Sequence, residues 1–308
     1  MEVVLPGGVV SAWAPGTWNG EILPPCERGI LETAMPELPE VETIARGLDA
    51  ALTGQHIASV HLRRDAVACG DAQRIREDVP GRCIKRVWRR AKLLLVDCVP
   101  DRHLVFHLKM SGKLLLGGPL AGQEKHVQAW FGLQSGESFV FQDVRKFGYI
   151  RLFDGAELAK WPFFASLGPE PFDLDGPGFA RILSGRRARI KSLLLDQTVI
   201  AGIGNIYADE ALFRAGIHPA TPADRLSPGA LNRLVYALHA ALNKGFASGG
   251  SSLRDYVDAL GKRGSHQNEF QVYGRCGASC PCCGRCLERT TVAGRTSTFC
   301  PRCQPLSD

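Results

Sequence analysis

Residues 280–303 read CPCCGRCLERTTVAGRTSTFCPRC, which contains two CxxC pairs separated by 16 residues. The pairs consist of Cys280, Cys283, Cys300 and Cys303. Two such pairs around a hairpin-length insert have the spacing of a tetrahedral zinc site, and a site closed by four thiolates is structural. Cys282 cannot easily replace Cys283, because that would alter the spacing of the first pair. The stretch therefore predicts a small zinc β-hairpin; the alternative is a set of reduced thiols without a metal.

This hairpin ends a long and basic chain. Seven of the 11 cysteines in 308 residues lie between Cys276 and Cys303, a distribution that does not fit a secreted disulfide framework. Residues 1–34 hold one base and four acids, a net charge of −3, and the whole chain carries +6, so residues 35–308 carry +9. A basic globular body favours an anionic partner such as nucleic acid, although charge alone is equally compatible with general solubility. No apolar run approaches the ~20 residues that span a bilayer, so we expect no membrane partner.

The spacing of apolar residues predicts the order of the secondary structure. Residues 1–34 show neither a helical nor a strand period, and their prolines and glycines indicate disorder. Helical spacing from Glu40 predicts an amphipathic first helix, with Val41, Ile44, Leu48 and Leu52 on one face. Seven short strand-like runs between residues 56 and 153 then predict an antiparallel sandwich or barrel.

After the strands the pattern becomes helical. Residues 166–178, SLGPEPFDLDGPG, have the composition of an interdomain linker, and the helical runs that follow extend to SSLRDYVDALG at 251–261. We therefore expect a multidomain α+β chain. Its expected parts are an extension at 1–34, a β-sandwich domain at 35–165, a linker at 166–178, a helical domain at 179–262 and a zinc hairpin module at 263–308.

Three further stretches carry candidate binding residues. In AGIGNIYADEALFRAGIHP (201–219), glycines lead into a helix with Asn205 in its first turn, where free N–H groups could bind a phosphate. The alternative, a close helix crossing, is favoured by spacing alone. In DVRKFGYI (143–150), Arg145 beside Phe147 suits an aromatic wedge for a base stack, although such a phenylalanine usually belongs to the core.

Met110 in HLKMSGKL is also more typical of a core position, and Lys92 in RRAKLLL could contact phosphate or simply be solvated. The most unusual stretch is TAMPELPEVE (33–42), which crowds prolines and acids behind a methionine as if a protein began there.

Together these stretches resemble the bacterial formamidopyrimidine-DNA glycosylase family, bifunctional base-excision enzymes for oxidised purines. The resemblance runs from Met35 to about Gln304. The matching segments, in family order, are MPELPEVET, RRAKLLL, HLKMSG, DVRKFG, LGPEP, GIGNIYADEALF, AGIHP, QVYGR and the CxxC pairs. The resemblance implies an N-terminal β-sandwich, a helix–two-turns–helix domain and a C-terminal zinc hairpin. It also implies glycosylase activity with lyase activity by β,δ-elimination.

The resemblance implies a role for each candidate catalytic residue. Pro36 matches the family's N-terminal proline, whose secondary amine attacks C1′ of the damaged nucleotide and forms a Schiff base. Glu37 matches the acid that moves protons during sugar-ring opening, and Lys92 matches a phosphate-binding lysine that holds the lesion. Arg295 matches the zinc-hairpin arginine that grips the backbone near the lesion.

Other matches imply contacts with DNA. Met110, Arg145 and Phe147 match residues that fill the space left by the extruded base and face its orphaned partner. Glu40 matches a supporting acid near the turn, and Asn205 matches a phosphate contact. Residues 261–271, GKRGSHQNEFQ, occupy the place of the loop that folds over the oxidised base.

The resemblance implies a cytoplasmic bacterial monomer with one structural zinc, acting on double-stranded DNA with an oxidised base. Two rivals remain: an endonuclease VIII-like glycosylase for oxidised pyrimidines, and a protein that binds lesion DNA without cleaving it. The second arises because the nitrogen of an internal proline is an amide and no nucleophile. We expect Met35 to be the true start and to be removed; a less favoured alternative is that residues 1–34 are a pro-segment.

Overall fold

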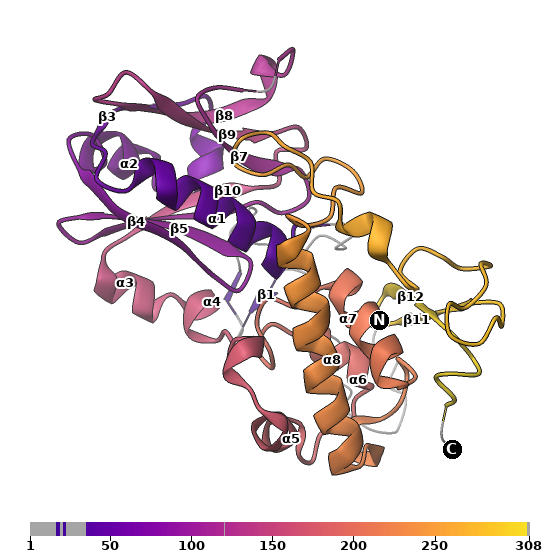
Figure 1. Ribbon diagram of the computed structural model, residues 1–308. Helices are drawn as coiled ribbons and strands as arrows, with labels where there is room; N and C mark the ends of the chain where they lie inside the picture. Colours follow the sequence, from indigo (N-terminus) through magenta and orange to yellow (C-terminus); the bar gives the residue numbers. More distant parts are fainter. Residues whose placement is uncertain (1–16, 19–20, 23–34, 120, 307–308) are drawn as a thin grey trace, which may run out of the picture.

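The computed structural model describes residues 17–18, 21–22, 35–119 and 121–306 (Figure 1). We expected disorder in residues 1–34, and all but four of these residues lie outside the part of the chain that the structure describes. At these four positions β1 (Thr17–Trp18) and β2 (Glu21–Ile22) form a short antiparallel pair, which the sequence pattern did not predict. No helix in the described parts of the chain combines the length and the apolar character needed to cross a membrane.

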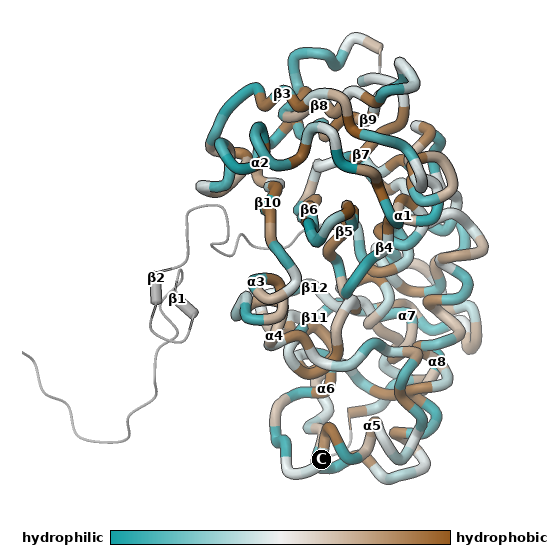
Figure 2. The backbone as a smooth tube through the Cα atoms, turned by 90° about the vertical axis from the view of Figure 1, so that its left-hand side faces the viewer, coloured by the Kyte–Doolittle hydropathy of each residue, from teal (hydrophilic) through white to brown (hydrophobic). Residues whose placement is uncertain are grey.

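Two four-stranded antiparallel sheets form a β-sandwich, as the sequence predicted. The first sheet, in spatial order, is β10 (Tyr149–Phe153), β6 (Arg102–His107), β5 (Leu93–Val99) and β4 (Cys83–Arg90). The second is β3 (Ile57–Leu62), β8 (Val127–Leu133), β9 (Ser138–Asp143) and β7 (Gly112–Leu116). Phe106 of the first sheet meets Phe131 and Phe141 of the second edge to face, with ring centroids 5.8 and 5.9 Å apart. Figure 2 shows brown, apolar stretches in these strands.

Helix α1 (Leu38–Leu52) joins the sandwich to the rest of the molecule. Its predicted apolar face, including Val41, Ile44 and Leu48, is buried in the sandwich core. Leu38, at the start of the helix, is buried instead in the core of the helical part. The first turn of α1 therefore lies between the two cores, as Figure 1 shows where its indigo ribbon meets the orange α8. Residues at this end of α1 contact both parts at once.

The helical part consists of α5 (Gly176–Leu183), α6 (Ile190–Leu195), α7 (Asn205–Ala215) and α8 (Pro228–Ala247). Ser227 caps α8 by accepting a hydrogen bond from Ala230 N at 3.2 Å, and Pro228 takes the first helical position. Around the sandwich lie α2 (Ala72–Asp78), α3 (Gly155–Lys160) and α4 (Pro162–Ala165). The short 3₁₀ helices are η1 (Asp65–Ala68), η2 (Glu124–His126), η3 (Pro171–Asp173), η4 (Ala223–Arg225) and η5 (His266–Glu269).

The expectation of a helix at 251–261 is wrong, because this segment is an irregular loop. Gly249 and Gly250 have φ of +65° and +83°, left-handed values that end α8 and prevent the chain from continuing as a helix. The Ser252 side chain then donates to Tyr256 O at 2.8 Å, a local bond that replaces helical pairing. The apolar period misled the prediction because Tyr256, Val257 and Ala259 are indeed buried, although from a loop.

The C-terminal hairpin consists of β11 (Glu288–Val292) and β12 (Arg295–Phe299). Its two-residue turn has positive φ at both Ala293 (+51°) and Gly294 (+70°), the geometry that suits a tight hairpin. Two neighbouring acids of α7 hold the module in place. Asp209 pairs with the fully buried Lys191 at 2.6 Å and accepts Thr298 N at 3.1 Å.

Glu210, the next residue, accepts the N–H groups of three consecutive residues, Gln271, Val272 and Tyr273, at 2.9–3.0 Å. Carboxylates that collect several N–H groups in this way form strong charge-assisted bonds. The hairpin module is therefore fixed to α7 by specific polar contacts, in addition to the apolar contacts of Phe213 with the module.

Candidate active site

The Glu37 carboxylate lies at the contact between α1 and α7. It comes directly before α1, and its Oε1 accepts Ile206 N at 2.9 Å while Oε2 accepts Tyr207 N at 3.4 Å. These N–H groups belong to the first turn of α7, which has no intrahelical acceptors for them. Burial raises the pKa of Glu37 to about 7, although nearby Lys92 acts in the opposite direction. The carboxyl group can thus exchange a proton near neutral pH.

Glycines allow this close approach. A Cβ atom on Gly204, which precedes α7, would lie 2.2 Å from the Glu37 Cδ. A Cβ on Gly202 would lie 2.5 Å from the Leu38 side chain, and Gly202 also has φ of +90°. The Leu38 N–H donates to Gly202 O at 3.1 Å, so the two segments are bonded through their backbones as well. The sequence around these glycines suggested either an anion site or a close helix crossing. Gly202 and Gly204 in fact permit a close crossing, which brings the Glu37 carboxylate to the N-terminus of α7.

Glu40 organises the other side of the same turn. Its buried carboxylate accepts Glu37 N at 3.0 Å, the Tyr207 hydroxyl at 2.8 Å and Ser251 N at 2.8 Å. The three donors come from the residue before α1, from α7 and from the loop after α8. Burial raises the pKa of Glu40, and the hydrogen bond from Tyr207 opposes this. Glu40 therefore fixes three separate segments around one point.

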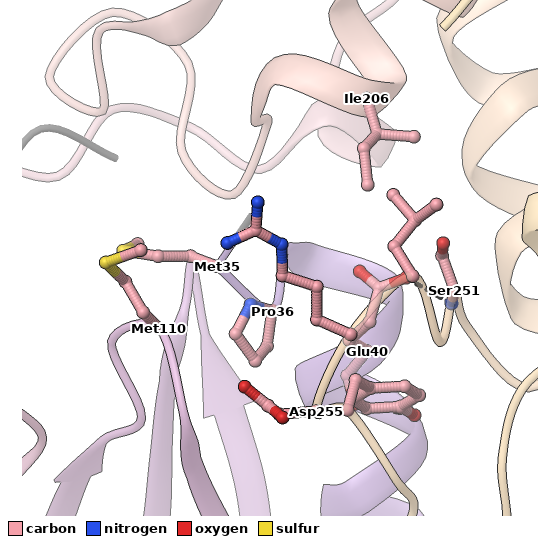
Figure 3. A pocket seen from close by; sticks show the side chains of 10 residues that line it. Met35, Pro36, Glu40, Met110, Ile206, Ser251 and Asp255 are labelled. Carbon is pink, nitrogen blue, oxygen red and sulfur yellow. Dashed lines mark hydrogen bonds between the residues drawn. The ribbon is translucent and has the colours of Figure 1, made fainter. Parts of the chain in front are cut away.

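Pro36 lies in the wall of a cavity that is open to solvent (Figure 3). Figure 3 shows Met35 and Met110 on one side of Pro36, and Glu40 and Ser251 on the other. The lining also includes Ile206 and the loop residues Leu253, Arg254, Asp255 and Tyr256. The cavity lies where the sandwich, the helical part and the loop after α8 meet, which is a common location for a ligand site.

Lys92 occupies the two-residue turn between β4 and β5 and is buried at 6 % exposure. It does not belong to the cavity lining, but its charge acts on Glu37. It also acts on His107, whose pKa is held well below its usual value, first by burial and then by the charges of Lys109 and Lys92. A buried ammonium beside a carboxyl group can bind an anion at this edge of the site.

The sequence-predicted residues Met110, Arg145 and Phe147 lie together. The Arg145 Nη1 donates to the Met110 sulfur at 3.0 Å, and its guanidinium carbon lies 4.7 Å from the centre of the Phe147 ring. Met110 lines the cavity, whereas Arg145 is exposed and Phe147 is half-buried. Phe147 is therefore not a core residue, which was the alternative interpretation of its sequence.

Asn205 and Arg295 are brought near each other by the hairpin. Asn205 Nδ2 donates to the carbonyl of Thr296, the residue after Arg295, at 3.1 Å. Asn205 also precedes Ile206, whose N–H binds Glu37, so the hairpin adjoins the N-terminus of α7. Both residues are half-buried and leave part of their surface to solvent.

The four cysteines of the two CxxC pairs form a separate cluster in the hairpin module. The sulfur atoms of Cys280, Cys283, Cys300 and Cys303 all lie within 4.8 Å of one another. A tetrahedral zinc site with Zn–S bonds of about 2.3 Å places its sulfurs about 3.8 Å apart. The Cys280–Cys303 and Cys283–Cys300 separations of 3.9 and 3.4 Å match this spacing, so the cluster could hold one metal ion. Cys282 is exposed and outside the cluster, as the CxxC spacing predicted.

The structure adds residues that sequence reasoning missed. Five residues of the loop at 251–256 line the cavity, whereas none of residues 261–271, which we expected to cover the lesion, belongs to its lining. The contacts of Tyr207 and Ser251 with Glu40 were also not predicted. Each depends on residues more than 160 positions apart, and no local spacing signals such a pair.

The two larger parts of this fold match two family models. Residues 35–150 match the formamidopyrimidine-DNA glycosylase N-terminal domain, and residues 167–257 match the formamidopyrimidine-DNA glycosylase H2TH domain. The formamidopyrimidine-DNA glycosylase of Nitratidesulfovibrio vulgaris is 38 % identical, with 88 % of this chain and 100 % of that protein aligned. The enzyme of the same name from Moorella thermoacetica is 46 % identical over 83 % of this chain and 94 % of its own length.

Solved structures agree with the sequence matches. A single-residue mutant of the Lactococcus lactis FPG, in complex with Fapy-dG containing DNA, has a TM-score of 0.81 and 36 % identity, covering 88 % of this chain and 100 % of that one. The Lactococcus lactis Fpg in complex with an abasic site containing DNA has the same TM-score and identity, covering 87 % and 99 %. Sequence, fold and site together place this chain in the formamidopyrimidine-DNA glycosylase family.

Proposed function

We propose that this protein is a base-excision glycosylase for oxidised purines, with formamidopyrimidines and 8-oxoguanine as substrates and with lyase activity at the resulting abasic site. The observation that carries the proposal is the placement of Pro36 in the cavity wall, directly before a buried carboxyl group with a pKa of about 7. The relatives are named formamidopyrimidine-DNA glycosylases, and one solved structure is a complex with Fapy-dG containing DNA, which supports the glycosylase part of the proposal.

The chemistry begins at the Pro36 nitrogen, provided that Pro36 is the N-terminal residue. Its lone pair forms a bond to C1′ of the damaged nucleotide, and the glycosidic bond breaks with its electron pair leaving on the base. The nitrogen then loses its proton, and the departing base takes up one proton, so that the charges balance. Breaking of the C1′–O4′ bond opens the sugar and leaves a Schiff base, an iminium between Pro36 and C1′. Glu37 is the proposed donor of the proton that O4′ takes up.

The lyase steps follow from the same iminium. Loss of a proton from C2′ expels the 3′ phosphate in β-elimination, and a second proton loss at C4′ expels the 5′ phosphate in δ-elimination. Lys92 and Arg295 are the cations we propose to hold the phosphates during these steps, with Asn205 as an additional phosphate contact.

The cluster of Met110, Arg145 and Phe147 is proposed to occupy the DNA stack after the damaged base has been extruded. The Met110 thioether lies at the cavity, and the exposed Arg145 guanidinium lies over the Phe147 ring. Together they present apolar and cationic surface on the same side of the protein. Unstacking a base costs a few kcal/mol, and inserted side chains recover part of that cost. We propose that one copy of the chain binds one site on double-stranded DNA.

Trapping with borohydride tests the proposal. Protein beginning at Pro36 is incubated with a duplex carrying one 8-oxoguanine, and borohydride delivers a hydride to C1′ of the iminium to give a stable amine. A covalent adduct together with strand cleavage is the expected result. Binding without an adduct would identify a lesion reader, and an adduct only with oxidised pyrimidines would identify the other branch of glycosylases.

The metal proposed for the cysteine cluster is zinc, because four thiolates with tetrahedral spacing suit this ion. We expect Cys300→Ser to lose the zinc and unfold the hairpin, since the module buries few apolar side chains of its own. Metal analysis should find one zinc per chain in the unaltered protein. DNA affinity should fall at least about tenfold in the variant while the sandwich stays folded.

Cys282→Ser is the matched control for this experiment, because Cys282 is exposed and lies outside the cluster. It should keep both the zinc and the DNA affinity. Absence of zinc from unaltered protein purified without chelators would contradict the assignment, as would zinc loss in the control.

A further inference from the structure

The turn that carries Lys92 is held by a residue from a distant part of the chain. The hairpin of β4 and β5 turns at Ala91 and Lys92, and Ala91 has φ of +53°, a left-handed value that an alanine rarely adopts. Glu170 lies in the segment between the sandwich and the helical part. Its Oε1 accepts the Ala91 N–H at 2.8 Å.

Two arginines of the same hairpin bind the same carboxylate. Arg90 Nη1 contacts Glu170 Oε1 at 2.8 Å, and Arg89 Nη1 contacts Oε2 at 2.6 Å. The three side chains are mostly buried, with exposed fractions of 18 % for Glu170, 11 % for Arg89 and 22 % for Arg90. Burial raises the pKa of Glu170, but the charge of Arg89 and the hydrogen bonds outweigh it and lower the pKa overall. Glu170 therefore remains a carboxylate at neutral pH.

The segment around Glu170 is also bonded to the loop that leads into α7. Gly168 N donates to Gln197 O at 2.9 Å, and Ala201 N donates to Pro169 O at 3.0 Å. The approach is close, since a Cβ on Gly168 would lie 2.6 Å from the Val199 backbone. The Gln197 side chain then bonds both Gly202 N and Ile203 O, at 2.7 and 2.9 Å, just before the N–H groups that bind Glu37.

A second connection returns to α1. Besides Glu170, Arg89 forms an ion pair with Glu42 of α1 at 2.8 Å. The carboxylate of Glu170 is thus connected to the Lys92 turn and, through Arg89, to α1. The backbone around Glu170 is connected to the loop before α7, whose first N–H groups bind Glu37. No comparable set of contacts is needed merely to join two domains, because a linker can be solvated.

We propose that Glu170 is a positioning residue for the reaction, which sets the place of Lys92 relative to Glu37 by holding the β4–β5 turn against the segment at 167–170. The inference rests on the proposed function, because it assigns Glu170 a role in that reaction. Glu170 acts through Lys92 rather than on the DNA. A catalytic group displaced by about 1 Å can lose as much as about a hundredfold in rate.

The test is a double-mutant cycle in protein that begins at Pro36. The variants are Glu170→Gln, Lys92→Ala and the two combined, and the readout is the single-turnover rate of base excision from an 8-oxoguanine duplex. Glu170→Gln should lower this rate about ten- to a hundredfold while affinity for undamaged duplex changes by less than about twofold. In the Lys92→Ala background the same change should cost less than about twofold, because the group being positioned is gone.

Two further variants keep the result interpretable. Asp173→Asn, an exposed acid in the same segment, is the control and should match the unaltered protein. Glu170→Asp keeps the charge but draws the carboxylate back from the turn, so it should lose rate while the protein stays folded. It replaces Glu170→Gln in the cycle if that variant is unfolded.

Equal losses with and without Lys92, or an unaltered rate in both Glu170 variants, would overturn the inference while leaving the proposed function intact. An inactive unaltered protein would instead remove the proposed function, and with it the role of Glu170. The two failures are therefore distinguishable in one set of assays.

Discussion

Protein that begins at Pro36 should be trapped on 8-oxoguanine duplex by borohydride, whereas the 308-residue chain should bind the same duplex without forming an adduct. The difference arises at one nitrogen. As an N-terminal residue Pro36 has a secondary amine, and an α-amino group with a pKa of roughly 8 is partly neutral at physiological pH. Within the longer chain the same nitrogen is a tertiary amide, whose lone pair is delocalised into the carbonyl.

The expected loss is complete rather than partial, because an amide nitrogen cannot form the iminium at all. Denaturing gels after borohydride treatment measure the adduct, and intact mass verifies the first residue of each protein. Binding of both proteins to an undamaged duplex serves as the control for folding. Pro36→Ala is a weaker test, since it leaves a primary amine that can also form a Schiff base.

Robust trapping of the verified 308-residue chain would contradict this assignment of the nucleophile. A lysine would then have to supply the amine, and Lys92, whose charge acts on Glu37, would be the first residue to examine. The result therefore decides between two chemically distinct nucleophiles as well as between an active and a silent form of the protein.

Sequence spacing was most informative where the site is local. The two CxxC pairs specified which cysteines cluster, because the pairs flank the two strands of one hairpin, which brings their four sulfurs together. The helical period of α1 was equally reliable, since it depends only on neighbours three or four positions away.

Spacing failed where the site depends on contacts between parts of the chain. Nothing near Glu170 or Tyr207 in sequence signals that their side chains meet Ala91 or Glu40. The loop at 251–261 was misassigned because its apolar residues repeat at helical intervals, although Gly249 and Gly250 impose a backbone that ends the helix. Family resemblance pointed to the residues proposed to do chemistry, and the three-dimensional contacts identified those that hold them in place.

The long-range contacts also explain how three parts of the chain form one site. Glu37 and Leu38 attach α1 to the N-terminus of α7, and Asp209 and Glu210 attach the hairpin module to the middle of the same helix. Helix α7 is thus the common support for the proposed acid, the proposed phosphate contact at Asn205 and the hairpin that carries Arg295.

Glu37→Gln should reduce the single-turnover rate of excision and ring opening by about a hundredfold or more, because general acid–base catalysis contributes about 10²–10⁴-fold. Glutamine has nearly the same shape and can still accept the Ile206 N–H, so the contact between α1 and α7 should persist. The variant loses the ability to deliver a proton and, besides that, only the longer hydrogen bond of 3.4 Å from Tyr207 N. Glu77→Gln, on the exposed face of α2, is the control and should leave the rate unchanged.

The pH profile gives a second and more specific readout. The proposed acid must be protonated, and the raised pKa of about 7 means that Glu37 progressively loses its proton above that pH. The Pro36 amine has the opposite requirement, since it attacks only when neutral, and its reference pKa is roughly 8. The fraction of protein with both groups in the required state is then largest between these two values, so the profile should be bell-shaped with its maximum near about pH 7.5.

The two limbs of this profile should respond differently to Glu37→Gln. A protonated Pro36 amine would stabilise the Glu37 carboxylate through its positive charge. Attack requires a neutral amine, so this charge is absent in the reactive form of the protein. Above about pH 8 the amine is mostly neutral, so further loss of rate reflects only deprotonation of Glu37. In Glu37→Gln this decline should disappear, and the remaining slow rate should rise with the neutral amine to a plateau. A glutamine variant that keeps both limbs would show that another group delivers the proton.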